Sequence, residues 1–210
     1  MTLRALERPA AGEAAGALVL LHGRGADEHD LRPLLDELDP ERRLHGYTPR
    51  ARLALPPGAA HWYVVERVGH PDPGTFWPSY RALVEWLDAL PYERVVVGGF
   101  SMGCVMSLAT SLGAELARRP AAVCGFSGFV PVVEGWSIDT SRPLPPVALG
   151  HGTADSVIGV AFARRARDQI LAAGGELLYH EYPLPHAIDP QFLAEVREWL
   201  WAKLAAPLSP

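Results

Sequence analysis

Residues 95–104 read Val95-Val96-Val97-Gly98-Gly99-Phe100-Ser101-Met102-Gly103-Cys104, which is a β-branched run followed by Gly-x-Ser-x-Gly and the start of a helical pattern. In such a strand–turn–helix the serine lies at a sharp turn, and Gly99 and Gly103 omit the Cβ atoms that would clash there. The hydroxyl of Ser101 is thereby presented at the carboxyl end of the strand, and we predict that it is a nucleophile. The backbone N–H of Met102, at the positive end of the helix, is predicted to stabilise a developing oxyanion.

Outward from this segment, short apolar runs alternate with stretches of helical spacing. The runs predicted as strands are residues 17–21, 52–55, 94–97, 121–126, 146–149 and 176–182. Helical spacing appears at Leu31, Leu34, Leu35 and Leu38, at Tyr80, Leu83, Val84 and Leu87, at Val105, Leu108 and Leu112, and a last helix is predicted from Asp189-Pro190 onward. Continuous apolar runs are typical of parallel strands that are covered on both faces. We therefore predict an α/β fold, with a mostly parallel, doubly wound sheet of about six to seven strands and helices on both faces.

An activated serine needs a general base, and we predict that His186 is this base. Residues 183–187, Pro-Leu-Pro-His-Ala, form a proline-stiffened loop between the last strand and the final helix, at the sheet edge where Ser101 emerges. His180 lies within the last strand pattern, where a place on the strand surface is the simpler interpretation. His151 precedes the predicted acid and is interpreted as a brace of its turn.

The acid that orients this base is predicted to be Asp155, because the chain order for this arrangement is serine, acid, histidine. Residues 146–155 read Pro-Val-Ala-Leu-Gly-His-Gly-Thr-Ala-Asp, which is a buried strand, a glycine turn and then the carboxylate. Asp155 is therefore expected at the same rim of the sheet as Ser101. Three other carboxylates have simpler explanations. Asp139 lies in a linker, Asp168 lies at a solvated position of a helix, and Asp189 is a helix cap.

A second oxyanion donor is expected from the loop after an earlier strand. Residues 20–27 read Leu-Leu-His-Gly-Arg-Gly-Ala-Asp, and the glycines on either side of Arg24 allow its backbone N–H to turn inward. An ordinary glycine-rich turn is the alternative, whereas neither a Gly-x-Gly-x-x-Gly nor a P-loop phosphate site can be read there. The guanidinium of Arg24 would favour substrates that bear a carboxylate or phosphate, unless it is solvated or paired with Asp27 or Glu28.

Four segments together resemble the phospholipase/carboxylesterase family of small serine α/β-hydrolases, the group that also includes acyl-protein thioesterases and lysophospholipases. They are residues 20–27, 99–103 and 151–155 and the loop that contains His186. The resemblance implies an α/β-hydrolase fold and carboxylic ester hydrolysis that needs no cofactor and no metal. It also implies a catalytic triad and two backbone oxyanion donors, which would be Ser101, Asp155 and His186, and Arg24 and Met102.

Two positions beside the predicted nucleophile depart from the family pattern. Members commonly carry glutamine where this chain has Met102, and a second glycine where it has Cys104. Met102 still supplies a backbone N–H, so we expect catalysis to be retained and the preference near Ser101 to differ. Ser127, in Gly-Phe-Ser-Gly, is not predicted as a second nucleophile, because no glycine stands two positions after it and no helical pattern follows at once.

The expected substrate follows from the loops around the site. Residues 56–78 are rich in glycine, proline and aromatics, and a loop of this length is often functional. Trp62 and Tyr63 are predicted to line an acyl pocket, with packing beneath the loop as the alternative, and residues 76–77 (Phe-Trp) are assigned to the same loop. Residues 127–145 leave no room for a helical lid domain, so we expect an open site for water-soluble, short- to medium-chain carboxylic esters.

Several alternatives stay open at this point. Lysophospholipase or thioesterase activity would use the same triad, and acyl transfer would differ only in the acceptor. A non-catalytic homologue that binds a small molecule is disfavoured, because all three triad positions are occupied by suitable residues. The sequence leaves the physiological ester undecided, and a homodimer is left open.

The composition excludes other classes of protein. Of 210 residues, 49% are hydrophobic and 20% are charged, which is unlike a disordered chain, and no linker divides the expected single domain of residues 1–210. A formal net charge of -5 does not fit a nucleic-acid-binding surface. Cys104 and Cys124 form neither a disulfide framework nor a zinc pattern. Without a signal-peptide cleavage site or an apolar stretch of ~20 residues, we expect a soluble, cytoplasmic protein with no membrane span.

Overall fold

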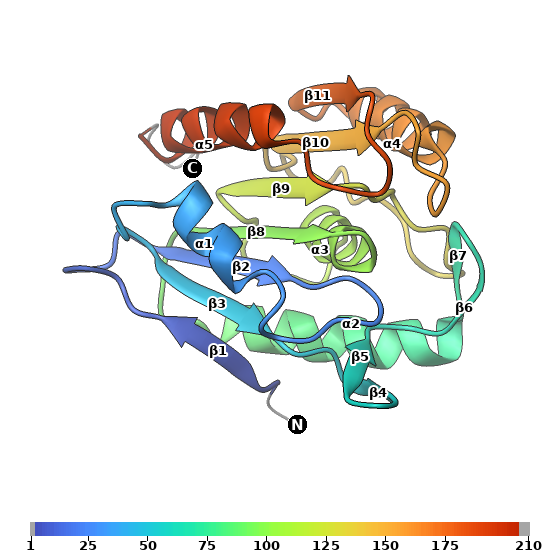
Figure 1. Ribbon diagram of the computed structural model, residues 1–210, viewed down its shortest axis with the longest axis horizontal. Coiled ribbons are helices and arrows are strands. Elements are labelled where there is room, and N and C mark those ends of the chain that lie inside the picture. The colour runs from blue at the N-terminus through green and yellow to red at the C-terminus, as the bar shows by residue number, and fades with distance from the viewer. Residues whose placement is uncertain (1–2, 206–210) are drawn as a thin grey trace.

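A central β-sheet organises the computed structural model, which describes residues 3–205 of the chain (Figure 1). Within these residues the sheet has seven strands, and in spatial order they are β1 (Ala5–Arg8), β3 (His45–Pro49), β2 (Ala17–Leu21), β8 (Val95–Phe100), β9 (Ala122–Phe126), β10 (Val147–Gly152) and β11 (Leu177–Tyr182). β1 is antiparallel to β3, and the other neighbouring pairs are parallel. The prediction of a mostly parallel α/β sheet is therefore confirmed.

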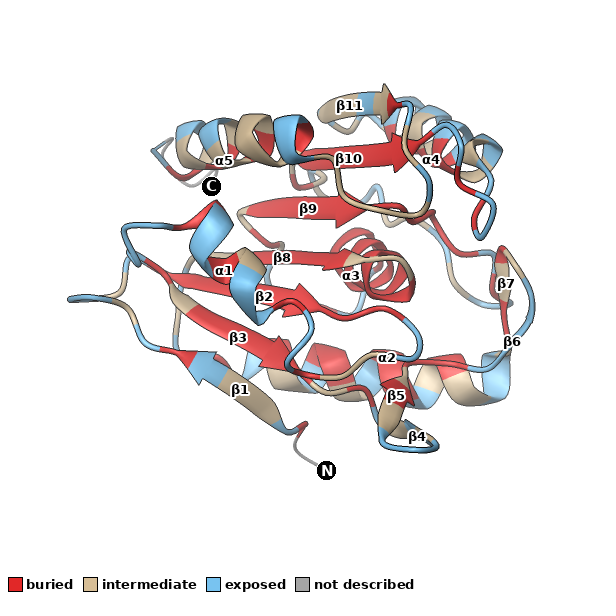
Figure 2. Ribbon diagram, in the orientation of Figure 1, coloured by how far each residue is buried: buried red, intermediate tan, exposed pale blue. Residues whose placement is uncertain are grey.

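Helices cover both faces of this sheet. One face carries α1 (Arg32–Leu38) and α5 (Pro190–Ala205), and the other carries α2 (Pro73–Asp88), α3 (Met102–Leu112) and α4 (Val160–Ala172) (Figure 1). All five residues of β2 are buried (Figure 2). Leu18 and Leu20 pack toward α1, while Val19 and Leu21 pack toward α2 and α3. Among residues 3–205, none of the helices is both long and apolar enough to cross a membrane.

One predicted strand does not belong to the central sheet. Residues 52–55 give β4 (Leu53–Leu55), which pairs antiparallel with β5 (Ala59–His61) in a separate ribbon. The place beside β2 is taken by β3, whose sequence His-Gly-Tyr-Thr-Pro carries no continuous apolar run. Gly46 suits this place because a Cβ there would lie 2.8 Å from the Leu35 side chain, so the absence of a side chain allows α1 to pack closely.

The predicted long loop of residues 56–78 is largely structured. It contains β5, β6 (Val65–Arg67) and β7 (His70–Pro71), and α2 begins at Pro73, so the assignment of residues 76–77 to a loop is wrong. The helix starts early because the side chain of Asp72 accepts a hydrogen bond from the N–H of Thr75 at 2.9 Å, and proline occupies the first helical position. The same Asp-Pro signal correctly placed the start of α5.

The carboxyl ends of the parallel strands bring several loops to one edge of the sheet. In Figure 1 the arrowheads of β2, β8, β9 and β10 point to this edge. The residues that follow these four strands are His22, Ser101, Ser127 and Thr153. Residues 127–146, between β9 and β10, form neither helix nor strand, so this interval holds no helical lid.

Candidate active site

Ser101 occupies the turn between β8 and α3. Its backbone has φ 55° and ψ -119°, a left-handed conformation that side chains other than glycine rarely adopt, and its N–H donates to the carbonyl of Phe126 at 2.9 Å. The turn packs tightly against β2: a Cβ at Gly103 would lie 1.8 Å from the carbonyl oxygen of Leu21, and one at Gly99 would lie 2.6 Å from the same oxygen. Only glycine at these two positions allows the helix to approach β2 so closely.

The structure brings together the three side chains that the sequence predicted as a triad. Nε2 of His186 lies 2.8 Å from Oγ of Ser101, and Nδ1 of His186 lies 2.6 Å from Oδ2 of Asp155. The side chain of Asp155 is fully buried, whereas that of His186 is 17% exposed. Ser101 lies 85 positions before His186 in the sequence, and Asp155 lies 31 positions before it. They become neighbours because the loops that carry them meet at one edge of the sheet.

Asp155 is held as a carboxylate. Its Oδ1 accepts hydrogen bonds from the backbone N–H groups of Val157 and Ile158, both at 2.8 Å. Burial by itself would raise the pKa of Asp155, but the hydrogen bonds from His186 and from these two N–H groups outweigh it and lower the pKa. An ionised Asp155 requires the proton of His186 to sit on Nδ1, so Nε2 is free to accept the hydroxyl proton of Ser101.

His151 closes the turn that carries this carboxylate. It is fully buried, and its Nε2 donates to the carbonyl of Ile158 at 2.7 Å. Burial lowers the pKa of His151, so the ring is neutral and the proton stays on the nitrogen that faces the carbonyl. The bond from His151 to Ile158 is consistent with the predicted role of His151 in bracing the turn. The hydrogen bond to Ser101 comes from His186.

The loop after β2 lies directly against the serine. A Cβ on Gly23 would sit 3.4 Å from the Cβ of Ser101. His22 fixes this loop, because its Nδ1 lies 2.7 Å from the carbonyl of Gly23 and its Nε2 accepts from the N–H of Ala51 at 3.1 Å. Burial lowers the pKa of His22, which keeps the imidazole neutral and able to both donate and accept.

The two predicted oxyanion donors flank this contact. Within residues 3–205, no hydrogen-bond acceptor is found for the backbone N–H of Arg24 or of Met102, the first residue of α3. Neither N–H group is used within the described residues, and their role as oxyanion donors stays a prediction. The side chain of Arg24 is exposed.

Trp62 and Tyr63 lie in the core rather than on an accessible pocket wall. Their exposed fractions are 0% and 3%. The indole Nε1 of Trp62 donates to the carbonyl of His22 at 3.0 Å, and its backbone N–H contacts the sulfur of Met102 at 3.2 Å. Both side chains are packed, as in the alternative interpretation, although Trp62 packs beneath the loop that carries Arg24 and the alternative named the loop of residues 56–78. Neither aromatic side chain offers surface to an acyl group in this structure.

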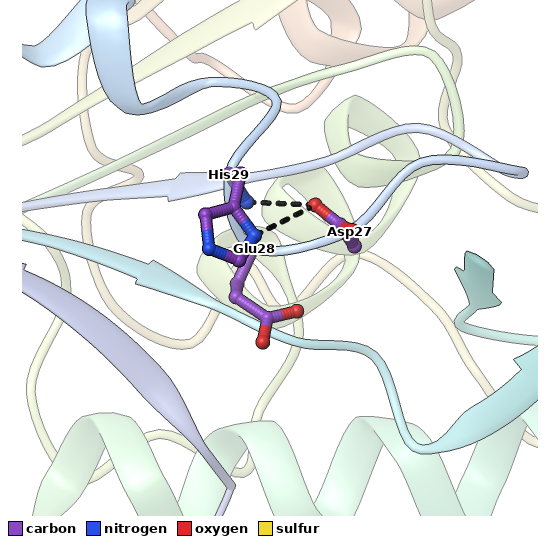
Figure 3. Close-up of side chains that lie close together, drawn as sticks. All are labelled: Asp27, Glu28 and His29. Carbon is purple, nitrogen blue, oxygen red and sulfur yellow. Dashed lines mark hydrogen bonds and ion pairs between the residues drawn. The ribbon is translucent and has the colours of Figure 1, made fainter. Parts of the chain in front are cut away.

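Asp27, Glu28 and His29 form a compact cluster on the same loop (Figure 3). One possible ligand atom from each lies within 4.8 Å of the others. These atoms are already engaged, because Oδ1 of Asp27 accepts from the backbone N–H of His29 at 2.9 Å and Glu28 is ion-paired with Arg50 at 2.7 Å and with Arg4 at 3.3 Å. The cluster braces the loop, and it also removes Asp27 and Glu28 as partners of Arg24.

The competing residues are placed away from the triad or in other roles. His180 is exposed on β11 beside Glu195, at 3.2 Å, and Asp168 is exposed on α4. Asp189 caps α5, accepting from Gln191 N–H at 2.7 Å. Asp139 pairs with Arg119 at 3.0 Å. Ser127 is fully buried and also has a positive φ of 53°.

Sequence reasoning missed one aromatic contact at the site. The ring of Phe100 lies 4.7 Å from the imidazole of His186, centroid to centroid, and covers one side of it. Phe100 immediately precedes Ser101, so its position in Gly-Phe-Ser was the available signal. The contact itself could not be predicted, because it depends on where the loop after β11 places His186.

An α/β sheet with a serine, a histidine and a carboxylate hydrogen-bonded in series at the carboxyl ends of its strands defines the α/β-hydrolase class. Within that class, the model of the phospholipase/carboxylesterase family matches residues 79–204, more than half of the chain, and the chain belongs to this family. The matched residues include all three members of the series.

Relatives and solved structures are similar to this chain over most of its length. The chain is 27% identical to acyl-protein thioesterase 1 of Yarrowia lipolytica, over 93% of this chain and 95% of that protein, and 28% identical to acyl-protein thioesterase 1 of Candida albicans, over 95% and 97%. The fold is similar to Zea mays acyl-protein thioesterase 2, with a TM-score of 0.80, 24% identity and coverage of 96% and 99%. It is also similar to the Bacillus cereus carboxylesterase, with a TM-score of 0.82, 20% identity and coverage of 96% and 94%.

Proposed function

We propose that this protein hydrolyses short- to medium-chain carboxylic esters through an acyl-enzyme formed on Ser101. The observation that carries the proposal is the continuous series from Ser101 Oγ to His186, 2.8 Å, and from His186 to Asp155, 2.6 Å. Family membership supports hydrolysis as the class of reaction. The substrate is a small-molecule ester, and the reaction needs neither a metal nor a cofactor.

Each step follows from the positions of these groups. Oγ of Ser101 attacks the ester carbonyl carbon while Nε2 of His186 takes its proton, and the negative charge of Asp155 stabilises the imidazolium that forms. The backbone N–H groups of Arg24 and Met102 bind the oxyanion of the tetrahedral intermediate. The imidazolium of His186 then gives this proton to the leaving alkoxide oxygen as the C–O bond breaks, which releases the alcohol. A water molecule that loses a proton to the same imidazole attacks the acyl-enzyme, and Ser101 recovers its proton as the acid leaves.

The preference for short to medium chains rests on the architecture of the rim. Residues 127–146 supply no helical cover, and Trp62 and Tyr63 are buried beneath the loop. Each methylene contributes about 0.8 kcal/mol only while the protein buries it, so a rim without such cover is expected to gain little beyond a modest chain length.

Thioester hydrolysis is the second candidate. The supporting observation is the name that the relatives carry, acyl-protein thioesterase 1, at 27% and 28% identity over nearly the whole chain. A thioester carbonyl would be attacked by the same serine, and the leaving thiolate needs less protonation by His186 than an alkoxide does. Lysophospholipid hydrolysis and acyl transfer use the same acyl-enzyme and differ in the leaving group or the acceptor.

A matched panel of substrates tests the proposal. We would measure kcat/KM for esters of graded acyl length, for thioesters of the same acyl groups and for a lysophospholipid, with and without an added alcohol. The proposal predicts that kcat/KM for the oxygen esters rises with acyl length, then levels off, and exceeds that of the matched thioesters. Higher kcat/KM on the thioesters would favour the second candidate, and no turnover of any of these substrates would reject both.

A further inference from the structure

Ser127 directly follows β9 and has a strained backbone conformation. Its φ of 53° lies in the left-handed region, where a side chain is strained. The residue is fully buried, and its N–H donates to the carbonyl of Gly150 at 2.8 Å. Glycine would adopt this conformation without strain, so the feature that serine adds is its hydroxyl.

That hydroxyl reaches the loop of the predicted general base. Oγ of Ser127 donates to the carbonyl of Ala187 at 3.2 Å, and the hydroxyl of Tyr182 donates to the same carbonyl at 3.3 Å. Tyr182 is the last residue of β11 and is 6% exposed, so both donors are shielded from water. Two buried hydroxyls, one at the last residue of β11 and one directly after β9, therefore hold the carbonyl of the residue that follows His186.

The rest of this loop is held mainly on the other side of His186. The N–H of Ala154 donates to the carbonyl of Leu184 at 3.1 Å, and the N–H of Thr153 donates to that of Tyr182 at 2.7 Å. A Cβ at Gly152 would lie 2.2 Å from the Leu184 carbonyl oxygen, so the two backbones are in direct contact there. After the histidine, the loop is held at the Ala187 carbonyl, two residues before Asp189, which caps α5.

We propose that Ser127 and Tyr182 are positioning residues that fix the His186 loop through the Ala187 carbonyl and keep Nε2 in line with Ser101. This inference rests on the proposed function, because it concerns the base of that reaction. Reactivity depends steeply on such alignment, since a displacement of about 1 Å can cost on the order of 100-fold in rate. Because either hydroxyl alone can still hold the carbonyl, removing both costs more than the product of the two single losses.

Four variants separate the hydroxyls from the backbone. Ser127→Ala removes the hydroxyl and keeps the strained conformation, and Ser127→Gly removes the hydroxyl and relieves it. Tyr182→Phe removes the second hydroxyl, and Ser127→Ala/Tyr182→Phe removes both. The matched control is Tyr179→Phe, because the Tyr179 hydroxyl is a partly buried donor on the same strand that bonds to Glu181 at 2.8 Å instead of to the His186 loop.

The kinetic readout is kcat and KM on a p-nitrophenyl ester of a short-chain acid, with Tm measured for every variant. We expect each single variant to lose less than about tenfold in kcat and the double variant to lose on the order of 100-fold, with KM nearly unchanged. Ser127→Gly should match Ser127→Ala in kcat while having the higher Tm. Tyr179→Phe should keep its kcat. A folded double variant that retains half of the wild-type kcat would overturn the proposal, as would a double variant whose loss in kcat is no greater than the product of the two single losses.

A second readout does not depend on turnover. The short hydrogen bond between His186 and Asp155, 2.6 Å, should give a low-field proton resonance in the wild-type NMR spectrum. The proposal predicts that this resonance shifts or broadens in the double variant and is unchanged in Tyr179→Phe. An unchanged resonance in the double variant would contradict it. If the wild-type protein hydrolyses no ester, the proposed function fails, and this resonance still decides whether the two hydroxyls position His186.

Discussion

The imidazole of His186 connects a buried carboxylate to a serine hydroxyl, so the identity of this one side chain determines whether the proton of Ser101 can move. Nδ1 faces Asp155 and Nε2 faces Ser101, whereas His180, six residues earlier on β11, is exposed and lies beside Glu195. The two histidines lie on neighbouring segments, yet only His186 contacts the serine and the aspartate.

Substitution of the two histidines should therefore have opposite outcomes. We expect His186→Ala to lower kcat by on the order of 10⁶-fold, as is typical when a member of such a triad is removed. His180→Ala should remain active, because its imidazole contacts neither reacting group. Steady-state hydrolysis of a short-chain ester checks both variants, and loss of activity in His180→Ala with retention in His186→Ala would reverse the assignment.

The side chain and the backbone of Arg24 are expected to do separate work. Its backbone N–H remains after Arg24→Ala, so activity on a neutral ester should fall by no more than about threefold. The guanidinium is exposed, and Asp27 and Glu28 are paired with other groups, so it is available to an anionic substrate. We predict a selective loss of about tenfold, or ~1.4 kcal/mol, in kcat/KM on a matched ester that bears a carboxylate.

The measurement for Arg24 is kcat/KM of wild type and Arg24→Ala on the two esters, with Arg24→Lys as a variant that keeps the charge. Equal losses on the neutral and anionic esters would leave Arg24 as a backbone donor only.

At the scale of elements, the approach of α3 to β2 sets the position of the serine. A Cβ on Gly103 would lie 1.8 Å from the Leu21 carbonyl oxygen, which is backbone and cannot rotate away. We expect Gly103→Ala to lower the free energy of unfolding by about 3 kcal/mol, at the upper end for an overpacked site. Gly12→Ala is the control, since a Cβ there would meet nothing within 4 Å, and its effect should stay within about 0.5 kcal/mol.

Urea denaturation of both glycine variants checks this prediction. A Gly103→Ala protein as stable as Gly12→Ala would show that the turn relaxes without cost and that close packing does not fix Ser101.

The way each strand is covered explains which strands could be predicted from the sequence and which could not. β2, β8, β9 and β10 are covered on both faces, so their apolar runs were visible without any knowledge of their partners. β1 and β3 were missed because their burial depends on distant contacts. Arg8 at the end of β1 is buried with its guanidinium bonded to Asp39 at 2.7 Å and to the carbonyl of Leu44 at 2.8 Å. A charged residue in this position gives no local signal of a strand.

The candidate site was predicted more completely than the loops around it. Ser101, Asp155 and His186 each follow a strand whose end could be located, and parallel strands deliver their carboxyl ends to one edge. Trp62 is buried in the core and bonds to the carbonyl of His22, 40 residues earlier, and Phe100 contacts a histidine 86 residues further on. Such contacts arise from tertiary packing that local patterns do not specify.

For the molecule as a whole, the open edge of the sheet leads to a kinetic prediction. Residues 127–146 contain no helix that would have to move before substrate enters. Activity on a short-chain ester should therefore rise hyperbolically with concentration and continue smoothly through the solubility limit. Initial rates across that limit check the prediction, and a sharp increase when an ester–water interface appears would contradict an uncovered site.

The central claim is that Ser101 is the nucleophile of the whole hydrolytic arrangement, and the most direct test is hydrolysis and fluorophosphonate labelling of wild type and Ser101→Ala. We predict that the wild-type protein takes up one label, at Ser101, and that Ser101→Ala takes up none while its kcat falls by on the order of 10⁶-fold. A folded Ser101→Ala protein that kept a tenth of the activity, or a label attached to another residue, would contradict the account.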